Sequence, residues 1–373
     1  MQLSCGRVLP EFELAYNTYR SLNATRSNAV LICPALNASH EVCGIDVTRP
    51  GHVGWWDNMV GPGKPIDTDR YFVIGVANIG VCFGSTSGRS VDPMTGFPYG
   101  ANFPMITVED WVSSQAMLAS QLGVQKFAAV IGGSLGGMQV LQWAVSHPDR
   151  VTHAVVIASA SNLSAQNIAF NAVARQAIIN DPNFRDGDYA AYDVAPKNGL
   201  SVARMLGHIT YTSYRGLDEK FGRNLEGEKP GYKLCSSDFE VECYLRHQGA
   251  KFAEHFDANA YLLITKALDY FDIQKGAEAS DLATAFENTT ASFLIIAFTE
   301  DWRFNPDRSK EVVSALKAAG KTVSYEQIDG PYGHDGFLLD DARYHHVVRS
   351  FFAGIPQEGL TSRTSHLGLT VAR

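Results

Sequence analysis

The sequence has few cysteines, and those few show no pattern typical of a disulfide scaffold or a metal site. Its six cysteines among 373 residues form no C-x-x-C pair and have no neighbouring histidines at zinc-finger spacing. Cysteines without disulfide or metal-site spacing are typical of proteins from a reducing compartment. We therefore expect free thiols, no metal site and a cytoplasmic location.

Long hydrophobic segments and an excess of positive charge are also lacking. No apolar run approaches the roughly 18 residues that span a bilayer, and the N-terminus lacks the pattern of a signal peptide. Lys and Arg total 31 against 39 for Asp and Glu, which gives a net charge of −8. This balance disfavours a broad nucleic-acid surface. We expect neither nucleic-acid nor membrane partners, and any anionic substrate must be held by a local basic pocket.

Apolar runs alternate with helical patterns in the first half of the chain. With 45% hydrophobic residues, a chain of this length can bury a large core. Thr107 and Asp110 resemble a capping box at the start of a helix that reaches Leu122. Nearly continuous apolar runs predict strands buried on both faces of a parallel sheet at residues 29–33, 71–77, 127–132 and 153–158.

The pattern changes after residue 159. Candidate helices at 165–180, 200–211, 239–256 and 258–270 follow one another without a convincing strand, until strands at 292–298 and 323–328 and a helix at 341–352 restore the alternation. The fold class is therefore α/β, with a mostly parallel sheet. We expect a core of residues 1–159 and 288–356, a helical insertion at 160–287, and a flexible C-terminal tail at 357–373.

A serine flanked by glycines follows one of the predicted strands. Residues 132–136 are Gly-Gly-Ser-Leu-Gly, which fits G-x-S-x-G with Ser134 at its centre, and a helical pattern begins directly afterwards. Small neighbours allow the sharp strand-to-helix turn that exposes a nucleophilic serine. The motif and its context predict that Ser134 is the nucleophile of an α/β-hydrolase fold.

A nucleophilic serine needs a general base, and the base needs an acid to orient it. In this fold the chain order is serine, acid, histidine, with each partner on a loop after a later strand. His334 follows the strand at 323–328, and Asp301 follows the strand at 292–298. We predict a triad of Ser134, Asp301 and His334, with Glu300 as an alternative acid.

Acyl chemistry also requires N–H donors for the developing oxyanion. One donor should be the backbone N–H of Leu135, directly after the nucleophile. The other should come from the loop after an early strand, where we choose Leu36. An ordinary strand-to-helix loop would have the same spacing. Residues 33–39 can therefore be interpreted either as an oxyanion loop or as a simple connection.

Several longer segments resemble the homoserine O-acyltransferase family. The resemblance runs from about Leu22 to Phe352, and its motifs are much more specific than G-x-S-x-G. The matching segments are 132–139 (GGSLGGMQ), 163–170 (LSAQNIAF), 173–177 (VARQA), 203–211 (ARMLGHITY), 256–261 (FDANAY) and 333–335 (GHD).

The resemblance implies an α/β-hydrolase core with a helical lid, and a homodimer formed through that lid. It also implies ping-pong acyl transfer from an acyl-CoA co-substrate to an amino-acid acceptor, without a permanent cofactor. By position, Arg204 matches the arginine that binds the amino acid, and Asp335 matches its acidic partner. A guanidinium suits an α-carboxylate and a carboxylate suits an α-ammonium group. Without the family match, either residue would be interpreted as part of a surface ion pair.

Arg303 lies two residues after Asp301, and family members with an arginine there resemble succinyl-CoA users. A cation in the pocket favours succinyl, because succinyl ends in a carboxylate that acetyl lacks. The alternative is an arginine that faces solvent or pairs with Asp307.

Four places differ from the family pattern. Pro34 stands where a histidine is usual, Asn37-Ala38 replaces a Thr/Ser-Gly pair, and Val81 and Arg89 replace a glycine and a proline. The first two changes lie beside the proposed oxyanion loop. Serine therefore stays an alternative acceptor. It is one methylene shorter than homoserine, and one methylene changes an enzyme's discrimination between substrates by only about 1–3 kcal/mol.

The leading hypothesis is a homoserine O-succinyltransferase. The alternatives are a homoserine O-acetyltransferase, a serine O-acyltransferase, and an esterase or thioesterase that uses water as the acceptor. A non-catalytic binding protein of the same fold is a further alternative, and the intact triad argues against it.

Overall fold

A mostly parallel sheet forms the centre of the molecule. The computed structural model describes residues 1–45, 49 and 51–356. Neighbouring strands of the main sheet are parallel except β1 and β5, which pair antiparallel at one edge. In spatial order the strands are β1 (Tyr16–Tyr19), β5 (Phe72–Val76), β2 (Ala29–Ile32), β6 (Ala129–Gly133), β7 (His153–Ile157), β8 (Ser292–Phe298) and β9 (Val323–Ile328). The predicted α/β sheet is confirmed.

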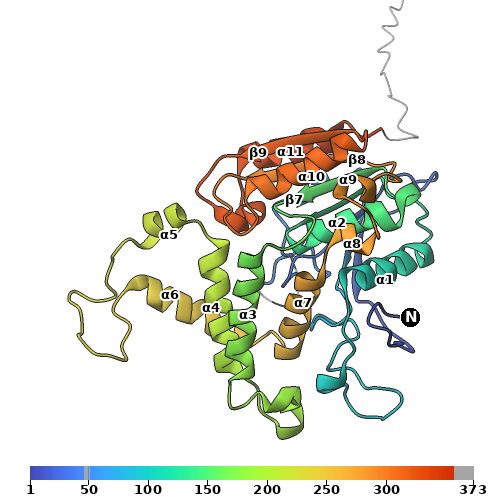
Figure 1. Ribbon diagram of the computed structural model, residues 1–373. Coiled ribbons are helices and arrows are strands. Elements are labelled where there is room, and N and C mark those ends of the chain that lie inside the picture. Colours follow the sequence, from blue (N-terminus) through green and yellow to red (C-terminus); the bar gives the residue numbers. More distant parts are fainter. Residues whose placement is uncertain (46–48, 50, 357–373) are drawn as a thin grey trace, which may run out of the picture.

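Helices cover both faces of this sheet (Figure 1). Successive side chains of a strand point to opposite faces, so alternate residues of β2 enter two different apolar clusters: Leu31 packs with one and Ile32 with the other. The first cluster also receives side chains of α1 (Val108–Gln121), α2 (Leu135–Ser146) and α10 (Pro306–Ala318); the second receives those of α11 (Ala342–Ala353) and the small β3 (Val60–Gly61) and β4 (Ile66–Asp67) pair.

A run of helices lies in the chain between β7 and β8. Helix α3 packs against α4 and α7, and α4 packs against α6, so these helices form a group at one side of the sheet (Figure 1). The helices are α3 (Ala165–Ile179), α4 (Lys197–Tyr211), α5 (Tyr214–Phe221), α6 (Glu240–Ala253), α7 (Ala258–Tyr270), α8 (Ile273–Gly276) and α9 (Leu282–Ala285). Short 3-10 turns complete the chain, including η5 (Gly333–Leu338) after β9. The division into core and insertion stays a prediction.

Most predicted elements are present within a few residues of their expected bounds. The Thr107 hydroxyl accepts from Asp110 N–H while the Asp110 carboxylate accepts from Thr107 N–H, which confirms the capping box at the start of α1. The sequence analysis did not predict β1, β3, β4 or the short helices α5, α8 and α9. In the described residues no helix is long and apolar enough to cross a membrane. The predicted tail at 357–373 lies outside the described residues.

Candidate active site

Ser134 occupies a sharp turn between β6 and α2. Its backbone has φ 57° and ψ −123°, a conformation that non-glycine residues rarely adopt. Such a residue costs on the order of 1–3 kcal/mol and persists only where its surroundings fix it. Here the Ser134 N–H donates to Ile157 O at 2.9 Å, and the Ser134 carbonyl accepts from the Ser159 hydroxyl at 2.8 Å. These bonds to the segment at and after β7 hold the turn.

The flanking glycines allow the close approaches that the turn requires. A Cβ on Gly136 would lie 2.4 Å from Cys33 O, and a Cβ on Gly132 would lie 2.5 Å from the carbonyl carbon of Gly136. Both distances fall well below an ordinary contact, and both neighbours are backbone atoms that cannot rotate away. The glycines of the motif are therefore needed for close packing of strand, helix and the loop after β2.

His334 in η5 connects Ser134 with Asp301. His334 Nε2 lies 2.8 Å from Ser134 Oγ, and His334 Nδ1 lies 2.8 Å from Asp301 Oδ2. A carboxylate only accepts hydrogen bonds, so Nδ1 carries the proton and Nε2 is free to accept from the serine hydroxyl. The three residues come from the carboxyl ends of three parallel strands, which meet at one edge of the sheet.

Asp301 is fixed on its other side by the backbone that follows it. Asp301 Oδ1 accepts from the N–H groups of Arg303 at 3.0 Å and Phe304 at 2.8 Å. Asp301 is 1% exposed, and the Phe304 ring stacks on the imidazole of His334 with centroids 5.0 Å apart. Glu300, the alternative acid, pairs instead with Arg215 at 3.2 Å. The geometry thus joins Asp301, and not Glu300, to the histidine.

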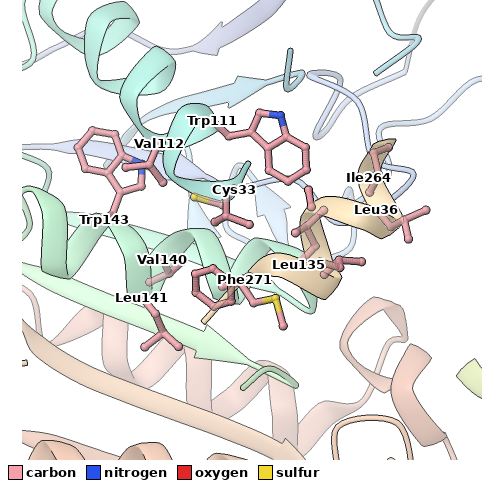
Figure 2. Close-up of a cluster of buried hydrophobic side chains, with 14 of the residues drawn as sticks. Cys33, Leu36, Trp111, Val112, Leu135, Val140, Leu141, Trp143, Ile264 and Phe271 are labelled. Carbon is pink, nitrogen blue, oxygen red and sulfur yellow. The ribbon is translucent and has the colours of Figure 1, made fainter. Parts of the chain in front are cut away.

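The predicted oxyanion donors belong to a cavity-lining loop and to the residue after Ser134. Leu36 lines the cavity with Ser134, and Leu135 directly follows Ser134. Figure 2 shows the side chains of Leu36 and Leu135 in the apolar cluster that contains Trp111 and Trp143. The oxyanion role of their N–H groups stays a prediction. The loop before Leu36 is held by Gln139 of α2, whose Nε2 donates to Pro34 O at 2.9 Å.

Charged side chains surround this cavity, which has a volume of about 70 Å³. Arg204 from α4 and Asp335 beside His334 both line it, and neither forms a salt bridge within the described residues. Burial raises the pKa of the Asp335 carboxyl above its ordinary value, although the charges of His334 and Arg204 oppose that shift. The Arg204 guanidinium carbon lies 4.9 Å from the Phe252 ring centroid. A cation and a carboxylate therefore face one small space.

Arg303 also lines the cavity and is only 7% exposed. Its guanidinium donates to Thr210 Oγ1 at 3.1 Å and to Asn171 Oδ1 at 3.0 Å, and lies 5.2 Å from the Tyr211 ring centroid. Asp307 contacts Lys310 instead. The alternative of a solvent-facing or Asp307-paired arginine is therefore wrong.

A second cavity of about 280 Å³ adjoins the first. The two share Asn37 and Arg204. The second is also lined by Lys251 and Phe252 of α6 and by His255, which follows that helix. It combines basic groups with aromatic surface, which suits a phosphate-bearing organic molecule. Across residues 1–45, 49 and 51–356, no cluster of three or more His, Cys, Asp or Glu side chains could hold a metal ion.

Sequence reasoning missed the residues that surround Arg303. Asn171 and Thr210 come from different helices, α3 and α4, and their contact with Arg303 depends on how those helices pack. The only available signal was their position, because Thr210 lies within one family-like segment and Asn171 directly follows another.

Comparisons with known proteins identify the fold and the family. A family model described as alpha/beta hydrolase fold matches residues 28–341. The homoserine O-succinyltransferase of Paraburkholderia xenovorans (strain LB400) is 58% identical over 362 residues, which cover 96% of this chain and 95% of that protein.

Two solved structures have the same architecture. The crystal structure of homoserine O-acetyltransferase from Bacillus anthracis superposes with a TM-score of 0.88 at 29% identity, covering 94% of each chain. The crystal structure of esterase E22 superposes with a TM-score of 0.85 at 26% identity, covering 94% of this chain and 96% of that one. The chain belongs to the homoserine O-acyltransferase family, within the α/β hydrolases.

Proposed function

We propose that this protein is a homoserine O-succinyltransferase, an acyltransferase that moves succinyl from succinyl-CoA to the hydroxyl of L-homoserine. The observation that carries the choice of donor is Arg303, whose buried guanidinium faces the cavity of Ser134 and contacts only neutral side-chain acceptors among the described residues. A buried cation without a carboxylate partner favours an anionic ligand. The identity to homoserine O-succinyltransferases supports the same choice.

In the first half of the proposed reaction, His334 Nε2 takes the Ser134 proton as Oγ attacks the thioester carbon. The N–H groups of Leu36 and Leu135 stabilise the oxyanion of the tetrahedral intermediate. His334 then returns the proton to the leaving CoA sulfur, and a succinyl-serine ester remains. Asp301 stabilises the imidazolium that exists between these two proton transfers.

In the second half, the acceptor hydroxyl attacks the ester. Arg204 binds the α-carboxylate of homoserine and Asp335 binds its α-ammonium group, which places the hydroxyl near His334. His334 takes the hydroxyl proton and later gives it to Ser134 Oγ as the O-succinylhomoserine product leaves. The acid and base roles of one histidine thus alternate through the cycle.

Other parts of the chain have proposed supporting roles. The cavity beside Lys251 and His255 receives the CoA arm, since it shares the lining residues Asn37 and Arg204 with the acyl cavity. The helices between β7 and β8 act as a lid that limits hydrolysis of the ester by water. Apolar side chains on the lid, including Val173 at 59% and Val202 at 50% exposure, support a homodimer through these helices.

A kinetic matrix tests the proposal. The kcat/KM of the enzyme is measured with succinyl-CoA or acetyl-CoA against L-homoserine or L-serine, with CoA release recorded also without acceptor. We expect the highest value for succinyl-CoA with homoserine. A preference for acetyl-CoA would make the protein a homoserine O-acetyltransferase, and a preference for serine would change the acceptor.

An esterase or thioesterase is the second candidate, because esterase E22 shares the architecture. The acceptor groups Arg204 and Asp335 would have no role in hydrolysis. CoA release at the same rate with and without homoserine would favour this candidate over acyl transfer.

Replacing Arg303 by leucine should remove the preference for the succinyl donor. We expect kcat/KM for succinyl-CoA to fall about 100-fold, because a charge-assisted pair with the donor carboxylate is lost, while the value for acetyl-CoA stays within about threefold. Arg308→Leu is the matched control, since Arg308 contacts Glu311 and Asn162. An unchanged donor ratio in Arg303→Leu would refute the donor assignment.

Replacing Arg204 by leucine should impair the second half of the reaction. We expect the KM for homoserine to rise by about 100-fold, while the succinyl-enzyme still forms in a single turnover. The exposed lid residue Arg223 provides the control variant Arg223→Leu. Normal homoserine KM together with slow acylation would assign Arg204 to the donor instead.

A further inference from the structure

A buried hydrogen-bond network extends outward from Arg303. Asn171 of α3 lies between Arg303 and Asp269 of α7: its Nδ2 donates to Asp269 Oδ1 at 2.8 Å, and its Oδ1 accepts from Arg303 Nη2 at 3.0 Å. Arg175, one helical turn after Asn171, donates to Asp269 Oδ2 at 2.6 Å. Asn171 is 2% exposed, so water does not replace these partners.

The two neighbours of Asn171 fix the orientation of its amide. A guanidinium only donates hydrogen bonds and a carboxylate only accepts them. The amide oxygen must therefore face Arg303, and the amide nitrogen must face Asp269. A rotation of the amide by 180° would place N–H groups against the guanidinium and leave two oxygens facing each other.

Thr210 supports the other side of the guanidinium in the same manner. Its hydroxyl donates to Gly207 O at 3.1 Å, so a lone pair of Oγ1 remains for Arg303 Nη1 at 3.1 Å. Thr210 is fully buried, at 0% exposure. Two opposite Nη groups of Arg303 are thus held by two oriented oxygens.

Both of these oxygens are neutral, and the nearby carboxylates are used elsewhere. Asp269 is neutralised by Arg175 and separated from Arg303 by the Asn171 side chain. Asp301 contacts the backbone N–H of Arg303 and the imidazole of His334. The network therefore holds the guanidinium in place without neutralising its charge.

We infer that Asn171 and Thr210 are positioning residues for donor specificity. They orient Arg303 toward the cavity and leave its charge available for the terminal carboxylate of a dicarboxylic acyl donor. Asp269 and Arg175 act one step further away, because they fix the amide orientation of Asn171. This inference rests on the proposed function, in which Arg303 binds the succinyl carboxylate.

The test compares donors in the intact enzyme. Asn171→Leu keeps the side-chain size but removes the oxygen that faces Arg303. We expect its ratio of kcat/KM for succinyl-CoA over acetyl-CoA to fall at least about 10-fold, mainly through a higher KM for succinyl-CoA. Gln176→Leu is the matched control on the exposed side of α3 and should keep the wild-type ratio.

Thr210→Val tests the second oxygen and keeps the inference testable if Asn171→Leu does not fold. We expect the ratio to fall in the same direction, since valine has the shape of threonine without an acceptor. Two outcomes would overturn the inference and leave the proposed function intact. One is an equal loss of kcat/KM with succinyl-CoA and with acetyl-CoA. The other is an unchanged donor ratio in both variants while Arg303→Leu lowers that ratio. An unchanged ratio in Arg303→Leu would refute the donor assignment and this inference together.

Discussion

Replacing Ser134 by alanine is expected to lower turnover of succinyl-CoA and homoserine by at least about 10⁴-fold, because the proposed acyl-serine intermediate can no longer form. Ser134 Oγ is the atom that contacts His334 Nε2. Alanine removes that atom without adding bulk to the strained turn. The proposed oxyanion donors and binding groups remain, so residual activity should reflect only direct attack by the acceptor.

The measurement combines steady-state CoA release with the intact mass of the protein after exposure to succinyl-CoA. The unmodified enzyme should gain one succinyl group, and Ser134→Ala should gain none. Ser113→Ala is the control, since Ser113 is exposed on α1 and its hydroxyl contacts only Glu109 O. A succinylated Ser134→Ala protein with near-normal turnover would end the acyl-serine mechanism.

Replacing Asp301 by asparagine is expected to lower kcat by about 10³–10⁴-fold with little change in KM. The amide oxygen would still accept from the N–H groups of Arg303 and Phe304, so the amide nitrogen would face His334 Nδ1. Nδ1 would then have to accept, and the proton would move to Nε2. In this tautomer the imidazole cannot take the proton of Ser134.

Glu300→Gln gives the matched control for this prediction. The change removes the ion pair with the half-exposed Arg215, and exposed pairs contribute only about 0–1 kcal/mol. We expect kcat within about threefold of the unmodified enzyme. A large loss in Glu300→Gln with near-normal kcat in Asp301→Asn would reverse the assignment of the acid.

The buried strands were predictable because burial on both faces produces a continuous apolar run. Strands β2, β5, β6, β7 and β8 all have this pattern. The edge strand β1 does not, because it consists of Tyr-Asn-Thr-Tyr with partial exposure and pairs on one side only. Its position depends on pairing with β5, a contact between residues that are distant in sequence.

Helix α5 was missed for a related reason. It is only eight residues long, so the helical spacing of Tyr214, Leu217 and Phe221 covers too few turns to distinguish a helix from a loop. Ser213 caps its first turn by accepting from Gly216 N–H, and Ser213 also donates to Pro331 O near η5. A short polar helix of this kind is stabilised by tertiary contacts that a local pattern does not contain.

The chain order of the candidate triad could be predicted, but the direction of neighbouring side chains could not. Glu300 and Asp301 are adjacent and chemically alike, and only the three-dimensional structure separates the buried carboxylate from the one that meets Arg215. The structure also shows what Val81 and Arg89, two departures from the family pattern, contact. Val81 is buried in the core, and Arg89 Nε donates to Asp257 at the start of α7.

The main chain and the side chain of Arg303 make separate contacts. The peptide nitrogen supports Asp301, which any residue except proline could do at this position, while the guanidinium contacts Asn171 and lies at the cavity. In the proposed function, a substitution of Arg303 therefore changes which acyl-CoA is preferred and leaves proton transfer at Ser134 undisturbed.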